Sequence, residues 1–519
     1  MKKILYINVL RLTIAATVLS GLTLSCSDDV MDKINEDINH PTSLSSNFVI
    51  TQVQTSLAFN VVGGDYNSYI AVCIEHEGGA DSQMYETDMR YYVMEDPSSW
   101  GNTWAYTYNN LAACKDIISI CSEDGAEPDN AVNLGIGKTL MAYQLALATD
   151  LHGDIPWSEA LDFSVYRAPQ LDKQETIYQE VFRLLDEALT AFNGGKASIA
   201  AQDLYYGGNV SNWIKAVYGL KARYTMRLLG RSSDRNGDLN KVLDYVSKSF
   251  TSASEEMKLD KYDAATFYNP LYTFARSRDY LGFSKSLMDK FVARNDPRQD
   301  QVAVNSNYEL ISPSSSDYNP IHNGEQDKGV YTKSAPDWAE KAPTQLLSYH
   351  ELLFLKAEAQ ARLGQDPSET LRAAIAAGFE NLANTIQAAI NSTFKNKVSG
   401  ELTLSAAAGE EHFDKNVKPL LSANAVKQVM IEKYLAFFGA SGEGVEAYAD
   451  IRRLKYLNED YIELVNPNNA ASATYPKGHF PLRLGYGNGD TNNNPNVSAA
   501  QGDGSFIYSE PVWWAGGSR

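Results

Sequence analysis

This chain of 519 residues contains few cysteines and few histidines, and its basic residues are outnumbered by acidic ones. Four cysteines and seven histidines, scattered without regular spacing, argue against a disulfide framework and against a metal-binding motif. Acidic residues outnumber basic ones by 64 to 45, and the net charge of -19 argues against nucleic acid as a partner. We therefore predict no metal and no cofactor, and we expect Cys73, Cys114 and Cys121 to be small buried hydrophobic residues.

Long apolar runs are absent beyond residue 25, so no membrane-spanning helix is expected there. The preceding residues differ, because a basic start leads into an apolar run that ends at Leu24. With Ser25 and Cys26 directly behind it, this run predicts a lipoprotein signal peptide of residues 1–25 and a lipid on Cys26. An ordinary secretory peptide with an incidental cysteine is the alternative.

The residues after the predicted cleavage site indicate a location. Ser27, Asp28 and Asp29 resemble a tag with which some Gram-negative bacteria send lipoproteins to the outer face of the outer membrane. We therefore expect a chain anchored in the outer membrane through its N-terminal acyl chains and facing the cell exterior. The strongly acidic mature chain has no other attraction to an anionic lipid surface.

The apolar periodicity is helical, and it predicts a mainly α fold with long irregular loops, few short strands and one domain over residues 26–519. Three helices are expected at 177–192, 213–228 and 349–363. Their predicted caps are a capping box formed by Asp172 and Glu175, an N-cap at Ser211 and a C-terminal Gly364. Helical pairs of this length suit tetratricopeptide-like (TPR-like) stacking, although no repeat of 34 residues can be recognised. The irregular segments are expected at residues 65–100, 262–280, 305–333 and 485–504.

No stretch of the chain carries a recognisable catalytic motif. The glycines at 135–139 lack the first glycine and the preceding strand of a phosphate-binding loop. Residues 75–77 read Glu-His-Glu but lack the second histidine of a zinc protease, and no nucleophile elbow occurs. Pairs of carboxylates are too numerous to be informative. We therefore predict a binding protein and not an enzyme.

The predicted ligand contacts are aromatic and lie in the irregular segments. Tyrosines number 31 against 18 phenylalanines, more than a core alone would need, and their rings can stack on sugars or peptide side chains. Trp104 and Tyr108, four residues apart in a helix, are expected in the core. The arginines at 276 and 278 favour ligands that carry carboxylates. The predicted ligand-binding residues are Tyr85, Arg90, Tyr92, Trp100, Asn102, Tyr272, Arg276 and Tyr318.

Several segments, taken in order, resemble the SusD/RagB family of outer-membrane nutrient-binding lipoproteins, in its SusD-like branch. Tyr448 and the Gly485-Tyr486-Gly487 step depart from the commoner residues of the family. The segments are 31–35, 39–41, 104–118, 150–160, 169–172, 203–208, 296–298, 351–359, 446–453 and 511–514.

The resemblance implies a TPR-containing scaffold that captures an oligosaccharide or a peptide and acts as the lid of a TonB-dependent, SusC-like barrel in the outer membrane. A lipid-anchored glycoside hydrolase and a TPR scaffold that binds only proteins are the alternatives. The matching segments themselves are expected to hold the fold. Asp154 and Pro156 suit a turn between helices, and Arg452 and Arg453 suit a paired network with Glu446 and Asp450.

Overall fold

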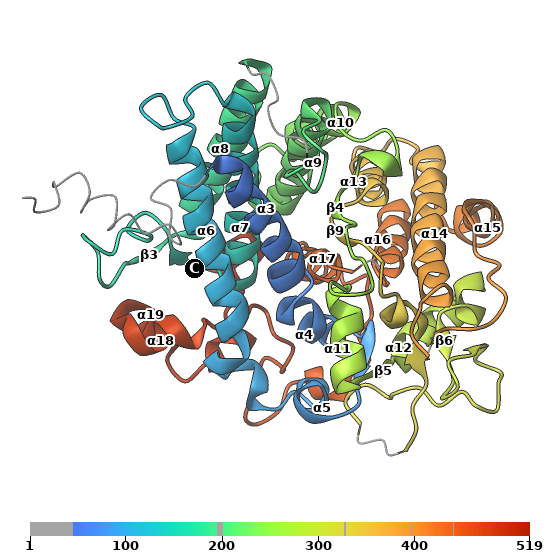
Figure 1. The fold of residues 1–519 in the computed structure, drawn as a ribbon. Helices are drawn as coiled ribbons and strands as arrows, with labels where there is room; N and C mark the ends of the chain where they lie inside the picture. The colour runs from blue at the N-terminus through green and yellow to red at the C-terminus, as the bar shows by residue number, and fades with distance from the viewer. Residues whose placement is uncertain (1–44, 195–200, 326–328, 396, 440) are drawn as a thin grey trace, which may run out of the picture. The chain divides into compact units, whose positions relative to one another are not determined.

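The computed structural model describes residues 45–194, 201–325, 329–395, 397–439 and 441–519 (Figure 1). Residues Ser46–Arg519 form one compact unit. The predicted signal peptide, Cys26 and the two segments at 31–35 and 39–41 lie outside the described residues. Across the described chain, no helix is both long enough and apolar enough to cross a membrane.

The described part of the chain is mainly helical, as predicted, and its strands are few and short. The α-helices are α3 Ser46–Ser56, α4 Asp65–Cys73, α5 Ser82–Asp88, α6 Gly101–Ile120, α7 Ala131–His152, α8 Gln174–Gly194, α9 Val210–Arg227, α10 Arg235–Ser247, α11 Pro270–Arg278, α12 Lys285–Ala293, α13 Tyr349–Arg362, α14 Ser368–Ile390, α15 Ala406–His412, α16 Ala425–Ala436, α17 Gly444–Tyr456, α18 Asn488–Asn493 and α19 Pro495–Gln501.

The strands pair antiparallel in three two-stranded sheets and one three-stranded sheet, ordered β1-β5, β2-β3, β4-β9 and β7-β6-β8. Their bounds are β1 Glu77–Gly79, β2 Ile155–Pro156, β3 Leu171–Asp172, β4 Met257–Leu259, β5 Leu281–Phe283, β6 Ala303–Val304, β7 Leu310–Ile311, β8 Lys333–Ser334 and β9 Thr344–Leu347.

Consecutive helices pack against each other, as expected for TPR-like pairs: α6 with α7, α7 with α8, α9 with α10, and α13 with α14. Helix α7 is buried along almost its whole length. Two of its glycines allow this, because a Cβ at Gly135 would lie 2.6 Å from the Phe192 ring of α8, and one at Gly137 would lie 2.7 Å from Ile117 of α6. The glycine-rich string at 135–139 therefore serves helix packing.

Two of the three predicted caps are wrong. Asp172 lies in β3 and accepts hydrogen bonds from the backbone N–H groups of Trp157 (2.9 Å) and Ser158 (2.8 Å). The start of α8 is instead bound by Asp154, which accepts from the backbone N–H of Gln174 at 2.9 Å. Asp154 thus lies in the connection between α7 and α8, as predicted, and also holds the second helix.

At the start of α9 the N-cap is Asn209, whose side chain accepts from the N–H of Asn212 at 3.2 Å, and not Ser211. Asparagine and serine are equally good N-caps, so the sequence alone did not separate them. The third cap is confirmed, because α13 ends at Arg362 and Gly364 has a φ of +71°.

The predicted irregular segments are only partly irregular. Helices α4 and α5 lie within 65–100, α11 within 262–280, and α18 and α19 within 485–504. The starts of α11 and α19 carry a signal that could have found them, since Asn269-Pro270 and Asn494-Pro495 each place an N-cap asparagine before a proline at the first helical position.

The three described cysteines are buried and unbridged, as predicted. Burial raises the pKa of Cys73 to about 11 and also raises the pKa of the Cys114 and Cys121 thiols. Each thiol therefore behaves as a small apolar side chain.

The predicted charge network is confirmed for Arg453, which donates to Glu358 at 2.7 and 2.8 Å and to Asp450 at 2.8 Å. Glu446 pairs with Arg223 and Arg227 of α9, and with neither of the arginines at 452 and 453.

Arg452 differs from the prediction because it has no carboxylate partner within the described residues. Its guanidinium donates only to the backbone carbonyls of Tyr448 (3.3 Å), Asp150 (2.8 Å) and Leu482 (3.3 Å). Arg452 therefore stands outside the paired network around it and resembles Arg90 and Arg483, which are also buried and held by carbonyl oxygens.

Candidate ligand-binding groove

Three of the predicted ligand contacts are buried inside the protein. Trp100 is 0% exposed, packs on Tyr69 with ring centroids 5.1 Å apart, and donates from its indole N–H to the carbonyl of Met94 at 3.2 Å. Arg90 is 1% exposed and is bound to the carbonyls of Cys73 and Thr87. Tyr272 is also buried. These side chains build the core, so we remove them from the set of direct contacts.

The other five predicted residues lie closer to the surface but do not form one site. Tyr92 is exposed and Tyr85 half-buried on the segment that leads into α6, and Asn102 is exposed in the first turn of that helix. Arg276 lies on α11 and stacks over the Phe394 ring, 4.8 Å from its centroid. Tyr318 is half-buried, with its hydroxyl unpartnered.

Of the predicted residues, Asn102 lines a polar groove of about 340 Å³ between the start of α4, the start of α6 and helix α11. Figure 1 shows these three elements. The close approach of α11 depends on Gly63, where a Cβ would lie 2.4 Å from the Pro270 ring. The residues that line the groove are Phe59, Asn60, Gly63, Gly64, Asp65, Ser68, Asn102, Tyr106, Pro270, Thr273, Phe274 and Ser277.

Asp65 is the charged group of the groove and the first residue of α4. Burial raises the pKa of this carboxyl above its ordinary value, although hydrogen bonds with the side chains of Asn102 and Thr103 and the positive charge of Arg278 act in the opposite direction. A partly desolvated carboxylate beside an amide can accept hydrogen bonds from ligand hydroxyl or amide N–H groups.

Aromatic rings form the rim. Tyr106 is 41% exposed, and Phe274 is half-buried on the opposite side of the groove. Tyr106 lies one helical turn beyond Asn102, so both side chains leave the same face of α6. An exposed ring next to hydrogen-bonding groups suits the two kinds of surface on a sugar, the apolar C–H face and the hydroxyl edge.

A cluster of tyrosines continues from the groove across Arg278. This guanidinium acts on Asp65, is hydrogen bonded to Tyr280, and lies 6.0 Å from the centre of the Tyr280 ring. Tyr280 in turn is hydrogen bonded to Ser82 at the start of α5. These contacts through Arg278 and Tyr280 link Asp65 in the groove to the start of α5.

On that surface Tyr85 and Tyr91 meet edge to face with ring centroids 6.3 Å apart, and their hydroxyls are hydrogen bonded. Tyr331 lies close enough to Tyr85 to affect its pKa. The exposed Tyr91 and the half-buried Tyr85 beside it extend the surface that a ligand longer than one sugar or residue could contact.

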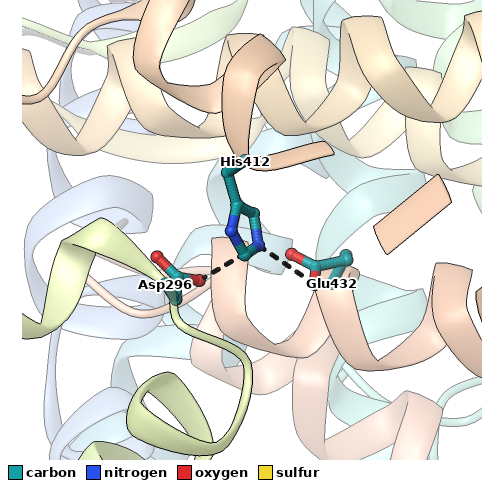
Figure 2. A group of neighbouring side chains, drawn as sticks. All are labelled: Asp296, His412 and Glu432. Carbon is teal, nitrogen blue, oxygen red and sulfur yellow. Dashed lines mark ion pairs between the residues drawn. The ribbon is translucent and has the colours of Figure 1, made fainter. Parts of the chain in front are cut away.

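Asp296, His412 and Glu432 form a buried cluster whose carboxylate and imidazole atoms are close enough for a metal ion (Figure 2). His412 Nε2 lies 3.6 Å from both carboxylates. Two arginines already bind these carboxylates, however: Arg298 donates to Asp296 and Glu432, and Arg294 donates to Glu432 at 2.7 Å.

Two guanidinium charges balance the two carboxylates of this cluster, so a divalent cation would add uncompensated positive charge. Burial alone would raise the pKa of Glu432, but Arg294, His412 and Arg298 together lower it to about 2. We interpret the cluster as a tie between α15, α16 and the turn at Pro297–Asp300.

Sequence reasoning missed Asp65, Tyr106 and Phe274. Tyr106 could have been found, because it follows the predicted Asn102 by four residues within a predicted helix. Asp65 and Phe274 carried no comparable signal, since they belong to short helices in segments expected to be irregular.

Comparisons with known proteins agree with this architecture. Residues 38–487 match the SusD-like_2 family, described as "Starch-binding associating with outer membrane". A SusD/RagB family protein from Bacteroides thetaiotaomicron VPI-5482 is 41% identical, with a TM-score of 0.87 over 92% of this chain and 100% of that one. A search of curated proteins found no significant match.

Two more distant structures share the fold. A chitin-binding protein is 22% identical, with a TM-score of 0.68 over 89% of this chain and 99% of that chain. A SusD homolog from Bacteroides fragilis NCTC 9343 is 19% identical, with a TM-score of 0.69 over 91% of this chain and all of that chain. The chain belongs to the SusD/RagB family of outer-membrane-associated nutrient-binding proteins, which bind without catalysis.

Proposed function

We propose that the protein captures an oligosaccharide at the groove between α4, α6 and α11. The observation that carries the proposal is the partly buried Asp65–Asn102 pair beside the exposed ring of Tyr106. Such a pair can accept and donate hydrogen bonds to sugar hydroxyls while the ring covers the apolar face. A peptide is the alternative ligand, and the exposed Arg276 and Arg278 favour one with carboxylates or an acidic sugar.

We further propose that the protein works as the lid of a TonB-dependent, SusC-like barrel, and that a lipid on Cys26 holds it at the cell surface. The lid role rests on family membership. The anchor rests on the signal-peptide pattern together with the absence of a membrane-spanning helix in the described residues. A binding protein without a route through the membrane needs a transporter to deliver what it captures.

Tyr106→Ala is expected to weaken oligosaccharide binding about 5- to 150-fold, because an aromatic contact at a binding site contributes on the order of 1–3 kcal/mol. Isothermal titration calorimetry of the mature protein with maltoheptaose, chitohexaose and a tripeptide library measures the effect. The matched control is Tyr166→Ala, because Tyr166 is 40% exposed, much like Tyr106, but lies outside the groove.

Equal loss of affinity in both tyrosine variants, or in neither, would rule out the groove as the binding site. Product analysis of the same mixtures separates the alternative functions. We expect intact oligosaccharides, whereas bond cleavage would favour a glycoside hydrolase, and no binding of sugar or peptide would favour a protein-binding scaffold.

Cys26→Ala is expected to move the protein from the membrane fraction to the soluble fraction and to abolish incorporation of labelled palmitate, because it removes the thiol that carries the proposed lipid. Cell fractionation and labelling measure both effects. Cys121→Ala serves as the control, since this buried thiol should leave membrane attachment unchanged. An acylated, membrane-bound Cys26→Ala protein would refute the proposed anchor.

A further inference from the structure

A second cavity lies at the C-terminal end of α17. It has a volume of about 390 Å³, within the range of small-molecule sites, and none of its lining residues is shared with the groove. We call it the α17 cavity. It is lined by Arg452, Lys455, Tyr456, Asn469, Lys477, Phe480, Leu482, Ser509, Pro511, Ala515 and Gly516.

The lining of the α17 cavity has only one sign of charge. Arg452, Lys455 and Lys477 are cationic, and no aspartate or glutamate is among the lining residues within the described ranges. Lys477 reaches only a backbone carbonyl, that of Ser509, at 3.3 Å. Three cations without a lining carboxylate stand out in a chain whose net charge is -19.

Arg452 is the buried member of these three cations. It is 2% exposed, and its Nη2 atom is buried without a hydrogen-bond partner in the described chain. Its guanidinium lies over the rings of Tyr448 and Trp514, at 3.9 and 4.9 Å from their centroids, so neither face is open to water. Burial lowers the pKa of Arg452, although the neighbouring Tyr448 and Asp150 side chains act in the opposite direction.

Three buried arginines of the described chain show what Arg452 lacks, whereas Arg90 and Arg483 resemble it in being held by carbonyl oxygens. Arg223, Arg298 and Arg453 each form short ion pairs with buried carboxylates. A buried guanidinium without such a partner is costly, because neither water nor a carboxylate replaces the hydration it has lost.

Asn469 adds a second donor without an acceptor. Its side-chain oxygen accepts a hydrogen bond from Nε of Arg90 at 2.9 Å, which fixes the orientation of the amide. The amide nitrogen of Asn469 is therefore the free end of this side chain, and it is buried without a hydrogen-bond acceptor in the described chain. Arg90, which the sequence placed at the ligand site, thus positions a donor at the α17 cavity instead.

The chemistry of a ligand follows from these groups. Unpaired cationic and amide donors require an acceptor with negative charge, and a carboxylate or phosphate group supplies both. The apolar side chains of Phe480 and Leu482 on the same lining, together with the volume, leave room for a body larger than the anionic group itself.

We propose that the α17 cavity binds a sugar-sized molecule that carries a carboxylate or phosphate group. The anionic group lies among Arg452, Lys455 and Lys477, and the apolar part of the molecule faces Phe480 and Leu482. The site is independent of the groove, and it gives an acidic protein a place for an acidic compound.

The test is calorimetry of the mature protein with glucuronic acid, glucose 6-phosphate and inorganic phosphate, with glucose as the neutral control. We expect binding of at least one anionic sugar, no binding of glucose, and affinity that falls with increasing sodium chloride. Phosphate binding as tight as that of glucose 6-phosphate would show that the anionic group alone is recognised, and would contradict the sugar-sized ligand.

Lys455→Gln/Lys477→Gln is expected to weaken binding of the anionic sugar by about 10-fold or more, because hydrogen bonds to charged groups contribute about 1.5–3 kcal/mol each. Both lysines are exposed, so the variant should fold. Lys341→Gln/Lys427→Gln is the matched control, with two equally exposed lysines that do not line the cavity.

The proposal would be overturned if no anionic probe bound, if glucose bound equally well, or if both double variants lost the same affinity. Tyr106→Ala separates this proposal from the function of the groove, since it should leave binding of the anionic probe unchanged. Loss of that binding in Tyr106→Ala would place the anion in the groove and reject the α17 cavity.

Discussion

Replacing Glu358 with alanine is expected to destabilise the protein by about 3–5 kcal/mol, because one partner of a buried ion-pair network is removed. Glu358 is fully buried on α13 and binds Arg453 through both of its oxygens, at 2.7 and 2.8 Å, and Arg362 at 2.7 Å. Its loss leaves the Arg453 guanidinium buried with Asp450 as its one remaining carboxylate partner among the described residues.

Urea unfolding followed by tryptophan fluorescence measures this change. Glu411→Ala is the control, because Glu411 pairs with Lys415 on the surface, where both side chains are more than 60% exposed. A surface pair of this kind contributes about 0–1 kcal/mol. Equal destabilisation by the two substitutions would contradict the role assigned to the network.

The contribution of Glu358 to the free energy of unfolding should depend on pH. Burial alone would raise the pKa of this carboxyl, but the Arg453 and Arg362 guanidiniums outweigh burial and hold it below the ordinary value of 4.5. A carboxyl whose folded pKa is depressed stabilises the fold above its unfolded pKa and loses that contribution as the pH falls. The stability difference between wild type and Glu358→Ala should therefore shrink below about pH 4.5.

Asp203→Ala is expected to cost about 3–5 kcal/mol, because it leaves several buried donors without an acceptor, each at about 1–3 kcal/mol. Asp203 accepts from the Trp213 indole N–H (2.8 Å), the Gly208 backbone N–H (2.8 Å) and the Gln54 amide (2.7 Å). One carboxylate thereby joins α3, α9 and the turn before α9.

Asp263→Ala is the matched control for Asp203→Ala. Asp263 also accepts from three backbone N–H groups, those of residues 265–267, at 2.8 to 2.9 Å, but it is exposed. Water can replace the Asp263 carboxylate as the acceptor for these N–H groups, so we expect the substitution to lower the free energy of unfolding by about 1 kcal/mol or less. Thermal unfolding of both variants, followed by circular dichroism, tests the comparison. Similar melting temperatures would show that burial of the donors does not decide the cost.

The sequence predicts the helical scaffold well because its signal is local. The predicted apolar positions of α8 recur with the helical period and are all buried, namely Ile177, Val181, Leu184, Leu185, Ala188 and Phe192. The cap at Gly364 is local as well, because it depends on the backbone freedom of one residue. The start of α8 was mispredicted because its donor is satisfied by Asp154, twenty residues away, and no local pattern encodes such a contact.

The ligand contacts were harder to predict because exposure is a property of the folded chain. Trp100 and Tyr92 have similar sequence surroundings, yet Trp100 is fully buried and Tyr92 is 67% exposed. Arg452 and Arg453 are neighbours, yet only Arg453 meets carboxylates, because successive residues of a helix point about 100° apart. Patterns that depend on contacts between distant segments were therefore beyond the sequence.

The three buried cysteines connect the chemistry of the thiols to the opening of the fold. Cys73 lies in α4, Cys114 in α6, and Cys121 directly after α6, and none is accessible while these helices remain packed. Oxidants and alkylating reagents therefore meet these sulfur atoms only after the surrounding helices separate. In an oxidising environment the chemical lifetime of the thiols then depends on how often the packed helices open as well as on the concentration of the oxidant.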